Sequence, residues 1–141
     1  MAHSRFMGLM AMVLVFASCS VMKKNTFKET VWTGEYRMFV ADAGYETTTI
    51  QLSFLTGKSF TMAFKSTLPP HPSMYMNPDG TVDTQPGFSR EYERRGTYSI
   101  GNNILTLNMD DGTTLELRYL EGYLLYYGYP GEEPVRLAKK P

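Results

Sequence analysis

The chain has 141 residues, with 14 basic and 14 acidic side chains and one cysteine. This length suits a single domain, and the balanced charge argues against a nucleic-acid partner and against attraction to an anionic membrane surface. One cysteine allows no internal disulfide, so an apolar core has to hold the domain together.

Residues 1–18 have the composition of a bacterial signal peptide. Arg5 gives a basic start, an apolar run covers residues 6–16, and Ala17, Ser18 and Cys19 follow. As a helix that run would span roughly 16 Å, too short for a hydrocarbon core of about 30 Å. We therefore expect cleavage between Ser18 and Cys19.

The segment that ends at Cys19 resembles a lipobox, in which the thiol is alkylated with diacylglycerol before cleavage. Phe16 departs from the leucine that is usual three positions before the cysteine. The alternative is a plain secretory signal with a chance cysteine, but a lone exported thiol is unusual unless lipidation consumes it. The covalent lipid on Cys19 is the only attached group that we expect, and multiple acyl chains would make the anchor stable.

The expected organisation is therefore a lipoprotein signal peptide at 1–18, a lipidated N-terminus and flexible tether at 19–30, and a β domain at 31–141. Residues 20–30 are polar and show no hydrophobic period, which is typical of a spacer. No acidic cluster follows Cys19, which favours the periplasmic face. We expect the protein in the cell envelope of a Gram-negative bacterium, anchored to the outer membrane.

Beyond the tether, apolar and polar residues alternate with a period of two, which predicts β-strands and no long helix. Gly34 is expected to mark a bend or bulge in the first strand, and residues 65–89 are expected to form one long connection. The predicted strands are 31–40, 47–54, 59–64, 92–100, 104–109, 115–119, 123–127 and 135–138.

Eight antiparallel strands with one apolar face favour an all-β, up-and-down barrel, because closure removes exposed sheet edges. A two-sheet β-sandwich is the alternative. A barrel of this size is either filled by side chains or holds one small apolar ligand. An apolar cavity of about 300 Å³ or more would support the ligand. Its candidate binding residues point inward from the predicted strands: Phe54, Phe60, Met62, Phe64, Leu107 and Leu117.

Several short segments form a recognisable set: Gly34-Glu35-Tyr36, residues 40–44, strand 47–54, residues 95–98, residues 105–107 and residues 135–139. Together they resemble the N-terminal domain of the NlpE copper-resistance lipoproteins. The resemblance covers nearly all of the mature chain. It implies a small lipocalin-like barrel on a lipidated tether, and a sensor or accessory role in an envelope-stress or surface response through protein contacts. Val40 and Ala43 stand where the family has paired cysteines, so metal chemistry is not expected at that loop.

A second loop, residues 68–78, contains the only other soft metal ligands that are grouped together. His71, Met74 and Met76 combine an imidazole with two thioethers, a set that suits Cu(I). The favoured alternative is that Met74, Tyr75 and Met76 cover the barrel mouth as adaptable apolar filling.

The sequence offers little support for catalysis. His71 is the only histidine left after processing, and no Ser, Asp or Glu lies at a spacing that would place it beside that histidine, so we expect no enzyme. The charged run at residues 90–95 is typical of a solvated strand face. Residues 123–127 are apolar on both faces, so the chain itself covers them or they meet an envelope protein partner. The candidate contacts are Tyr123, Tyr126 and Tyr127.

Overall fold

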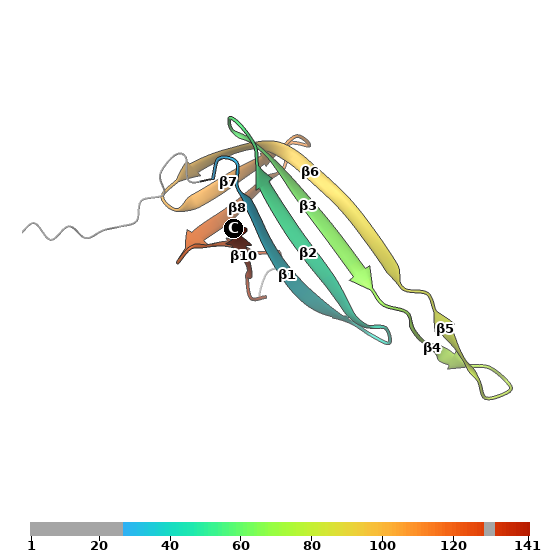
Figure 1. Cartoon of the computed structure of the whole chain (residues 1–141). Coiled ribbons are helices and arrows are strands. Elements are labelled where there is room, and N and C mark those ends of the chain that lie inside the picture. The colour runs from blue at the N-terminus through green and yellow to red at the C-terminus, as the bar shows by residue number, and fades with distance from the viewer. Residues whose placement is uncertain (1–26, 129–131) are drawn as a thin grey trace, which may run out of the picture.

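The computed structural model describes residues 27–128 and 132–141, and this part of the chain is built from ten β-strands and no helix. Eight strands form a closed antiparallel barrel in which each strand pairs with its neighbours along the chain, and β10 pairs with β1 to close the ring (Figure 1). The up-and-down barrel is therefore confirmed over the sandwich. Its strands are β1 (Val31–Val40), β2 (Gly44–Phe54), β3 (Ser59–Leu68), β6 (Phe88–Gly101), β7 (Ile104–Met109), β8 (Thr114–Leu120), β9 (Tyr123–Tyr126) and β10 (Val135–Lys139).

The predicted period of two places one face of each barrel strand in the core. On β3, Phe60, Met62 and Phe64 are buried whereas Thr61 and Ala63 face outward, as the alternation predicts. Complete burial of one such apolar side chain contributes roughly 1.5–3 kcal/mol, so the core can hold the domain together without a disulfide. No helix in the described ranges is long and apolar enough to cross a membrane.

Phe27, the first described residue, stands four residues before the first strand and already belongs to the core. The Phe27 side chain is completely buried, and its ring centroid lies 5.4 Å from that of Trp32 and 5.0 Å from that of Phe54. Thr30 accepts a 3.0 Å hydrogen bond from Nε1 of Trp32. The expectation that residues 27–30 belong to a flexible tether is therefore wrong, because Phe27 fills one end of the barrel.

Four strands continue well past the rest of the barrel. β10 pairs with β1 only at Trp32 and Thr33, and β7 pairs with β6 only from Gly96 onward. The pairing with β2 continues over the full length of β1, and the pairing with β6 continues over the full length of β3. The result is a four-stranded sheet (Figure 1), here called the extension, whose edge strands β1 and β6 have no further strand beside them in the described part of the chain. The extension is made of residues 34–40, 44–50, 61–68 and 88–95.

Gly34 lies where β10 meets β1 and then departs. A Cβ atom at this position would lie 2.6 Å from the carbonyl oxygen of Arg136 and equally close to the side chain of Leu137. The pairing of β1 with β2 runs through Gly34 without a shift in register. A bulge is therefore absent at Gly34, and the glycine is required for the close approach of β10.

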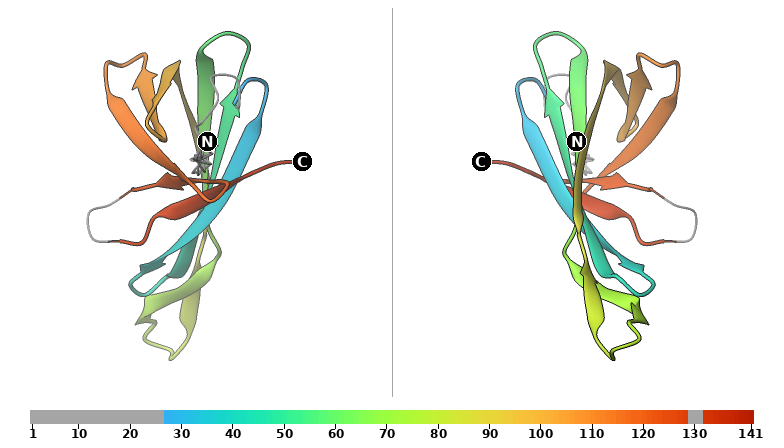
Figure 2. Two further views of the ribbon diagram at one scale, coloured as in Figure 1. Left: turned by 90° about the vertical axis from the view of Figure 1, so that its left-hand side faces the viewer. Right: turned by 90° about the vertical axis from the view of Figure 1, so that its right-hand side faces the viewer.

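The predicted long connection is also wrong. β3 continues to Leu68, and a separate hairpin follows, formed by β4 (His71–Met76) and β5 (Val82–Gln85). The hairpin continues beyond the extension, at the end of the molecule opposite the turn between β2 and β3 (Figures 1 and 2). β6 has 14 residues. A strand of that length spans roughly 45 Å, which makes the molecule elongated.

Candidate protein-contact surface

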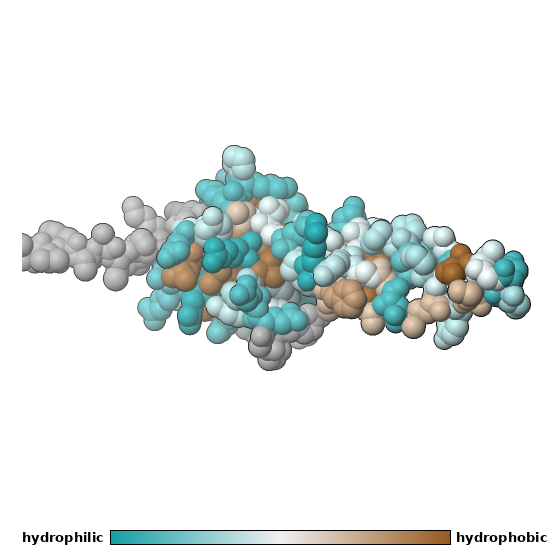
Figure 3. Space-filling model, turned by 90° about the horizontal axis from the view of Figure 1, so that it is seen from below, coloured by the Kyte–Doolittle hydropathy of each residue, from teal (hydrophilic) through white to brown (hydrophobic). Residues whose placement is uncertain are grey.

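The exposed apolar side chains gather at one end of the molecule. Eight of the twelve exposed large hydrophobic residues in the described ranges lie on the extension or the hairpin. Figure 3 shows apolar residues at this end of one face. We call the eight residues the arm surface: Met38, Phe39, Tyr45, Met74, Tyr75, Met76, Val82 and Tyr92.

A well-bonded polar turn fixes the end of the hairpin. The Asn77 backbone N–H donates to the Thr81 carbonyl at 2.7 Å, and the Asn77 side-chain amide donates to Asp83 at 3.1 Å. Hydrogen bonds from the hydroxyl and then the backbone N–H of Thr81 hold the pKa of the Asp79 carboxyl below its usual value. The turn therefore holds β4 and β5 together while the apolar residues of the hairpin stay exposed.

The hairpin does not cover the barrel mouth, so that interpretation of the sequence is wrong. The side chains of Met74, Tyr75 and Met76 are 68%, 82% and 70% exposed. β4 and β5 pair only with each other and extend away from the barrel (Figure 1). A free hairpin on an open sheet leaves these residues no core to pack against.

The β1–β2 turn presents a second part of the arm surface. The rings of Phe39 and Tyr45 meet edge to face across the two strands, with their centroids 5.5 Å apart. Both side chains are more than half exposed. This turn lies at the same end of the molecule as the hairpin (Figure 2). An ordered aromatic pair in solvent loses little conformational entropy when a partner covers it.

The inner face of the extension carries four polar side chains that are paired with one another. Glu46 is almost completely buried, and its Oε1 lies 3.4 Å from Nη2 of Arg90. The guanidinium of Arg90 also lies 4.3 Å from the ring centroid of Phe88. The hydroxyls of Thr48 and Ser66 share a 2.8 Å hydrogen bond. These satisfied groups stabilise the sheet, and none of them is arranged as a nucleophile beside a base.

Aromatic rings close the barrel mouth. Phe64 stacks on Tyr92 with centroids 4.6 Å apart, and Tyr126 approaches Phe64 at 6.1 Å from the opposite wall. Tyr126 thus belongs to the edge of the core. The other two tyrosines near it, Tyr123 and Tyr127, are exposed to solvent but lie outside the arm surface.

The two leucines of β9 are both buried, so this strand is apolar on both faces as its sequence indicated. Leu124 points into the core. Leu125 points outward and lies between Arg118 and Arg136 in the sheet register. The aliphatic parts of arginine side chains can cover apolar neighbours. Cover by the chain itself therefore accounts for the leucines, whereas Tyr123 and Tyr127 stay exposed.

The six candidate ligand-binding residues pack together in the core. Each is buried and belongs to a single cluster of apolar side chains that also includes Trp32, Tyr98 and Phe27. Phe54 meets Tyr98 edge to face with centroids 4.8 Å apart. A core packed in this way favours a structural role for Phe54, Phe60, Met62, Phe64, Leu107 and Leu117 over the binding of an apolar ligand.

The structure places the proposed copper ligands on the exposed hairpin. Met74 and Met76 are two residues apart on β4, and Nδ1 of His71 lies 3.2 Å from the carbonyl oxygen of Pro69. In the described ranges, no group of three or more His, Cys, Asp or Glu side chains is arranged to hold a metal ion. Copper binding through the two thioethers and the imidazole stays a prediction.

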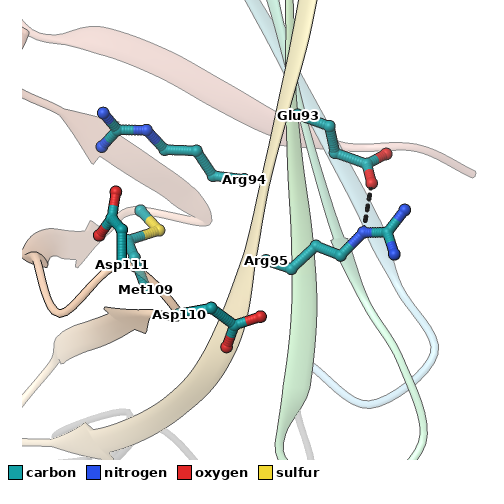
Figure 4. Close-up of a pocket in the computed structure, with 6 residues that line it drawn as sticks. All are labelled: Glu93, Arg94, Arg95, Met109, Asp110 and Asp111. Atoms are coloured by element: carbon teal, nitrogen blue, oxygen red, sulfur yellow. Dashed lines mark hydrogen bonds and ion pairs between the residues drawn. The ribbon is translucent and has the colours of Figure 1, made fainter.

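A charged notch lies where β7 turns away from β6. It has a volume of about 410 Å³ and is lined by Glu93, Arg94, Arg95, Met109, Asp110 and Asp111 (Figure 4). Nε of Arg95 donates to Glu93 at 2.7 Å, and the backbone N–H of Asp110 donates to the carbonyl of Arg95 at 2.9 Å. The Thr113 hydroxyl and, to a smaller extent, the charge of Arg94 lower the pKa of the Asp111 carboxyl.

Sequence reasoning identified the charged run on β6 as solvated, and the structure agrees, but it did not identify Phe39, Tyr45 or Tyr92 as surface candidates. Each of these aromatic residues stands in a strand that alternates normally, so the only available signal was strand length. Ser18 and Cys19 lie outside the described residues. No protein-family model, no curated protein and no solved structure matches this chain.

Proposed function

We propose that this chain is a lipid-anchored envelope protein that acts by binding another protein through the arm surface. The observation that carries the proposal is the concentration of exposed methionine and aromatic side chains at one end of an elongated molecule. Groups of exposed apolar side chains often mark a protein-contact site. Methionine adapts to varied partners, and tyrosine is enriched at binding hot spots.

The position of Phe27 supports an orientation for the anchored protein. Phe27 packs against Trp32 and against Phe54, the last residue of β2. The turn that follows β2 lies at the end of the molecule opposite the hairpin (Figure 1). Cys19 precedes Phe27 by eight residues, which reach at most about 28 Å. A lipid on Cys19 would therefore hold the barrel close to the membrane and leave the arm surface facing away from it.

The role that fits this arrangement is that of a sensor or accessory protein in an envelope-stress or surface response. The resemblance to NlpE lipoproteins supports it, as does an anchor on the periplasmic face of the outer membrane. From that position the arm surface would meet proteins of the periplasm or of the opposite membrane. The packed core supports this proposal over a carrier of small apolar molecules.

Site-specific photo-crosslinking in cells tests the contact. A photoreactive residue at Tyr75 is compared with one at Leu120, which is also exposed but lies on the barrel strand β8. We expect one discrete adduct from position 75 and none from position 120. A third photoreactive residue, at Tyr45, should give the same adduct. The triple change Met74→Ser, Tyr75→Ser and Met76→Ser should abolish that adduct from position 45, whereas Leu120→Ser should not. Equal adducts from both positions, or none, would refute the proposal.

The anchor has its own test. A Cys19→Ser form should accumulate as an unprocessed precursor, and the natural chain should begin with a lipid-modified cysteine in mass spectrometry of its N-terminus. Normal maturation of the mutant would rule out lipidation, while leaving the crosslinking result to decide the protein contact separately.

A further inference from the structure

β6 has a free backbone edge along the extension. β3 pairs with one side of β6 over residues 88–97, but β7 pairs with the other side only from Gly96 onward. In the described part of the chain, no strand lies along that second side of residues 88–94. This length corresponds to roughly 24 Å of open edge.

Two hydrogen bonds show which backbone groups face the open side. The N–H of Tyr98 donates to the carbonyl of Lys58 on the β3 side, and the carbonyl of Arg95 accepts from Asp110 on the β7 side. Successive residues of an antiparallel strand direct their backbone groups to alternate sides. The N–H and C=O groups of Ser89, Glu91 and Glu93 therefore point to the side that β7 leaves vacant.

The charges along this edge follow a regular pattern. On the inner face the edge carries Arg90 and Arg94, and on the outer face it carries Glu91 and Glu93. Glu91 and Glu93 pair with Lys65 and Arg95 at 2.9 and 2.7 Å, in ion pairs exposed to solvent. The chain itself provides one example of a complementary charge at this edge: Asp111, in the turn after β7, lines the same notch as Arg94. The charge of Arg94 helps to lower the pKa of that carboxyl, which agrees with their proximity.

The same charges oppose pairing between two copies of β6. In the antiparallel register centred on Tyr92, Arg90 would face Arg94 and Glu91 would face Glu93. Registers centred on Glu91 or Glu93 would place each of those glutamates opposite its own copy. Like charges directly across a sheet are destabilising, and natural edge strands use charges against self-association. Pairing of this edge with β6 of a second copy is therefore disfavoured, whereas pairing with a strand of complementary charge is not.

We propose that the free edge of β6 binds an extended segment of a partner protein as an added antiparallel strand. The segment carries basic side chains opposite Glu91 and Glu93, an acidic side chain opposite Arg90 and an apolar side chain opposite Tyr92. Main-chain hydrogen bonds to Ser89, Glu91 and Glu93 supply the pairing, and the charges select the register. This inference rests on the proposed function, because it assumes that the partner is a protein.

A synthetic peptide with the sequence Lys-Val-Lys-Glu-Thr-Val tests the proposal on the mature chain. Its first residue would face Glu93 and its fourth would face Arg90. The control is the charge-reversed peptide Glu-Val-Glu-Lys-Thr-Val. By NMR titration we expect at least a tenfold preference for the first peptide. Amide exchange should slow at Ser89, Glu91 and Glu93. The double variant Glu91→Lys and Glu93→Lys should reverse the preference.

The outcomes separate this inference from the proposed function. Equal binding of the two peptides, or slowed exchange confined to other strands, would overturn strand addition even if the crosslink from Tyr75 persists. Conversely, a selective peptide effect on β6 without any crosslink from Tyr75 would support strand addition and refute the arm surface as the contact.

Discussion

The backbones of Gly96 and Asn108 approach so closely that a Cβ atom on Gly96 would lie 1.9 Å from the Asn108 carbonyl oxygen. Gly96 is the first residue of β6 that pairs with β7, and Arg95 before it belongs to the open extension. The contact therefore stands at the point where the barrel separates from the extension.

Replacing Gly96 by alanine should destabilise the domain, because the methyl group has no space unless β7 moves. We expect a loss of about 3 kcal/mol in the free energy of unfolding, at the upper end of the cost of overpacking. Gly101→Ala is the matched control, since a Cβ there meets nothing within 4 Å. Urea denaturation of both variants measures the difference. Equal stability of the two would contradict the close approach.

Proline scanning should reveal the free edge of β6. Glu93 directs its N–H away from β3, so Glu93→Pro removes no strand hydrogen bond and should change stability little. Arg94 directs its N–H toward β3, and Arg94→Pro should cost roughly 2–3 kcal/mol because a backbone acceptor in the sheet loses its donor. Thermal unfolding of the two variants compares them. A larger loss for Glu93→Pro would show that the alternation along β6 is the reverse of that described.

The sequence predicted which side chains lie inside the barrel, because burial on one face imposes a period of two. It did not predict how far each strand extends past its neighbour. Residues 89–95 of β6 are all exposed, and alternation of buried and exposed residues begins only at Gly96, where β7 joins as a second neighbour. The charged run indicated exposure of this segment but not the loss of a neighbouring strand. Gly34 and Gly96 mark the points at which a neighbouring strand departs. From the sequence alone, however, a glycine in a strand indicates a bulge as readily as a close approach of another backbone.

The hairpin was missed for a different physical reason. Residues 69–72 contain three prolines, which remove backbone donors, and β4 pairs with β5 through an irregular register. The apolar residues Met74, Tyr75 and Met76 were therefore interpreted as filling for the barrel mouth. That interpretation assumed that apolar residues become buried within their own chain. The assumption is weakest at a binding surface, where a partner provides the burial.

The boundary of the domain can be tested at Phe27. Phe27→Ala should lower the free energy of unfolding by about 3–5 kcal/mol, since it removes a buried ring that contacts Trp32 and Phe54. Lys28→Ala, at an exposed neighbouring position, should have little effect. Chemical denaturation of soluble forms measures both. Similar stability of the two variants would show that Phe27 does not contribute to the core and belongs to the tether.

The lowered pKa of Asp111, in the notch beside β6, leads to a prediction about two substitutions. The Thr113 hydroxyl is the main cause of the lowered pKa of Asp111, and the charge of Arg94 contributes less. Thr113→Val should therefore raise that pKa toward 3.8 by more than Arg94→Gln does. NMR titration of the Asp111 carboxyl measures both shifts, and the opposite order would refute this assignment of causes.

The sign of the effect on stability follows from the direction of the shift. A carboxyl whose pKa is lower in the folded state stabilises that state above the ordinary pKa. The stabilisation disappears as the pH falls through the lowered pKa. The difference in stability between the natural chain and Thr113→Val should therefore be constant near neutral pH and shrink in acid. A difference that grows on acidification would contradict the shift.

Copper binding can be examined apart from every other prediction. Met74 and Met76 are exposed on the hairpin, and two thioethers with one imidazole and no thiolate give a weak Cu(I) site. We expect competition titrations with a Cu(I) chelator to show no affinity tighter than micromolar. Any weaker binding should vanish in the triple variant His71→Ala, Met74→Leu and Met76→Leu. Because those positions face solvent, the variant should stay folded, which near-ultraviolet circular dichroism checks. Tight binding that survives the three changes would place a copper site elsewhere in the chain.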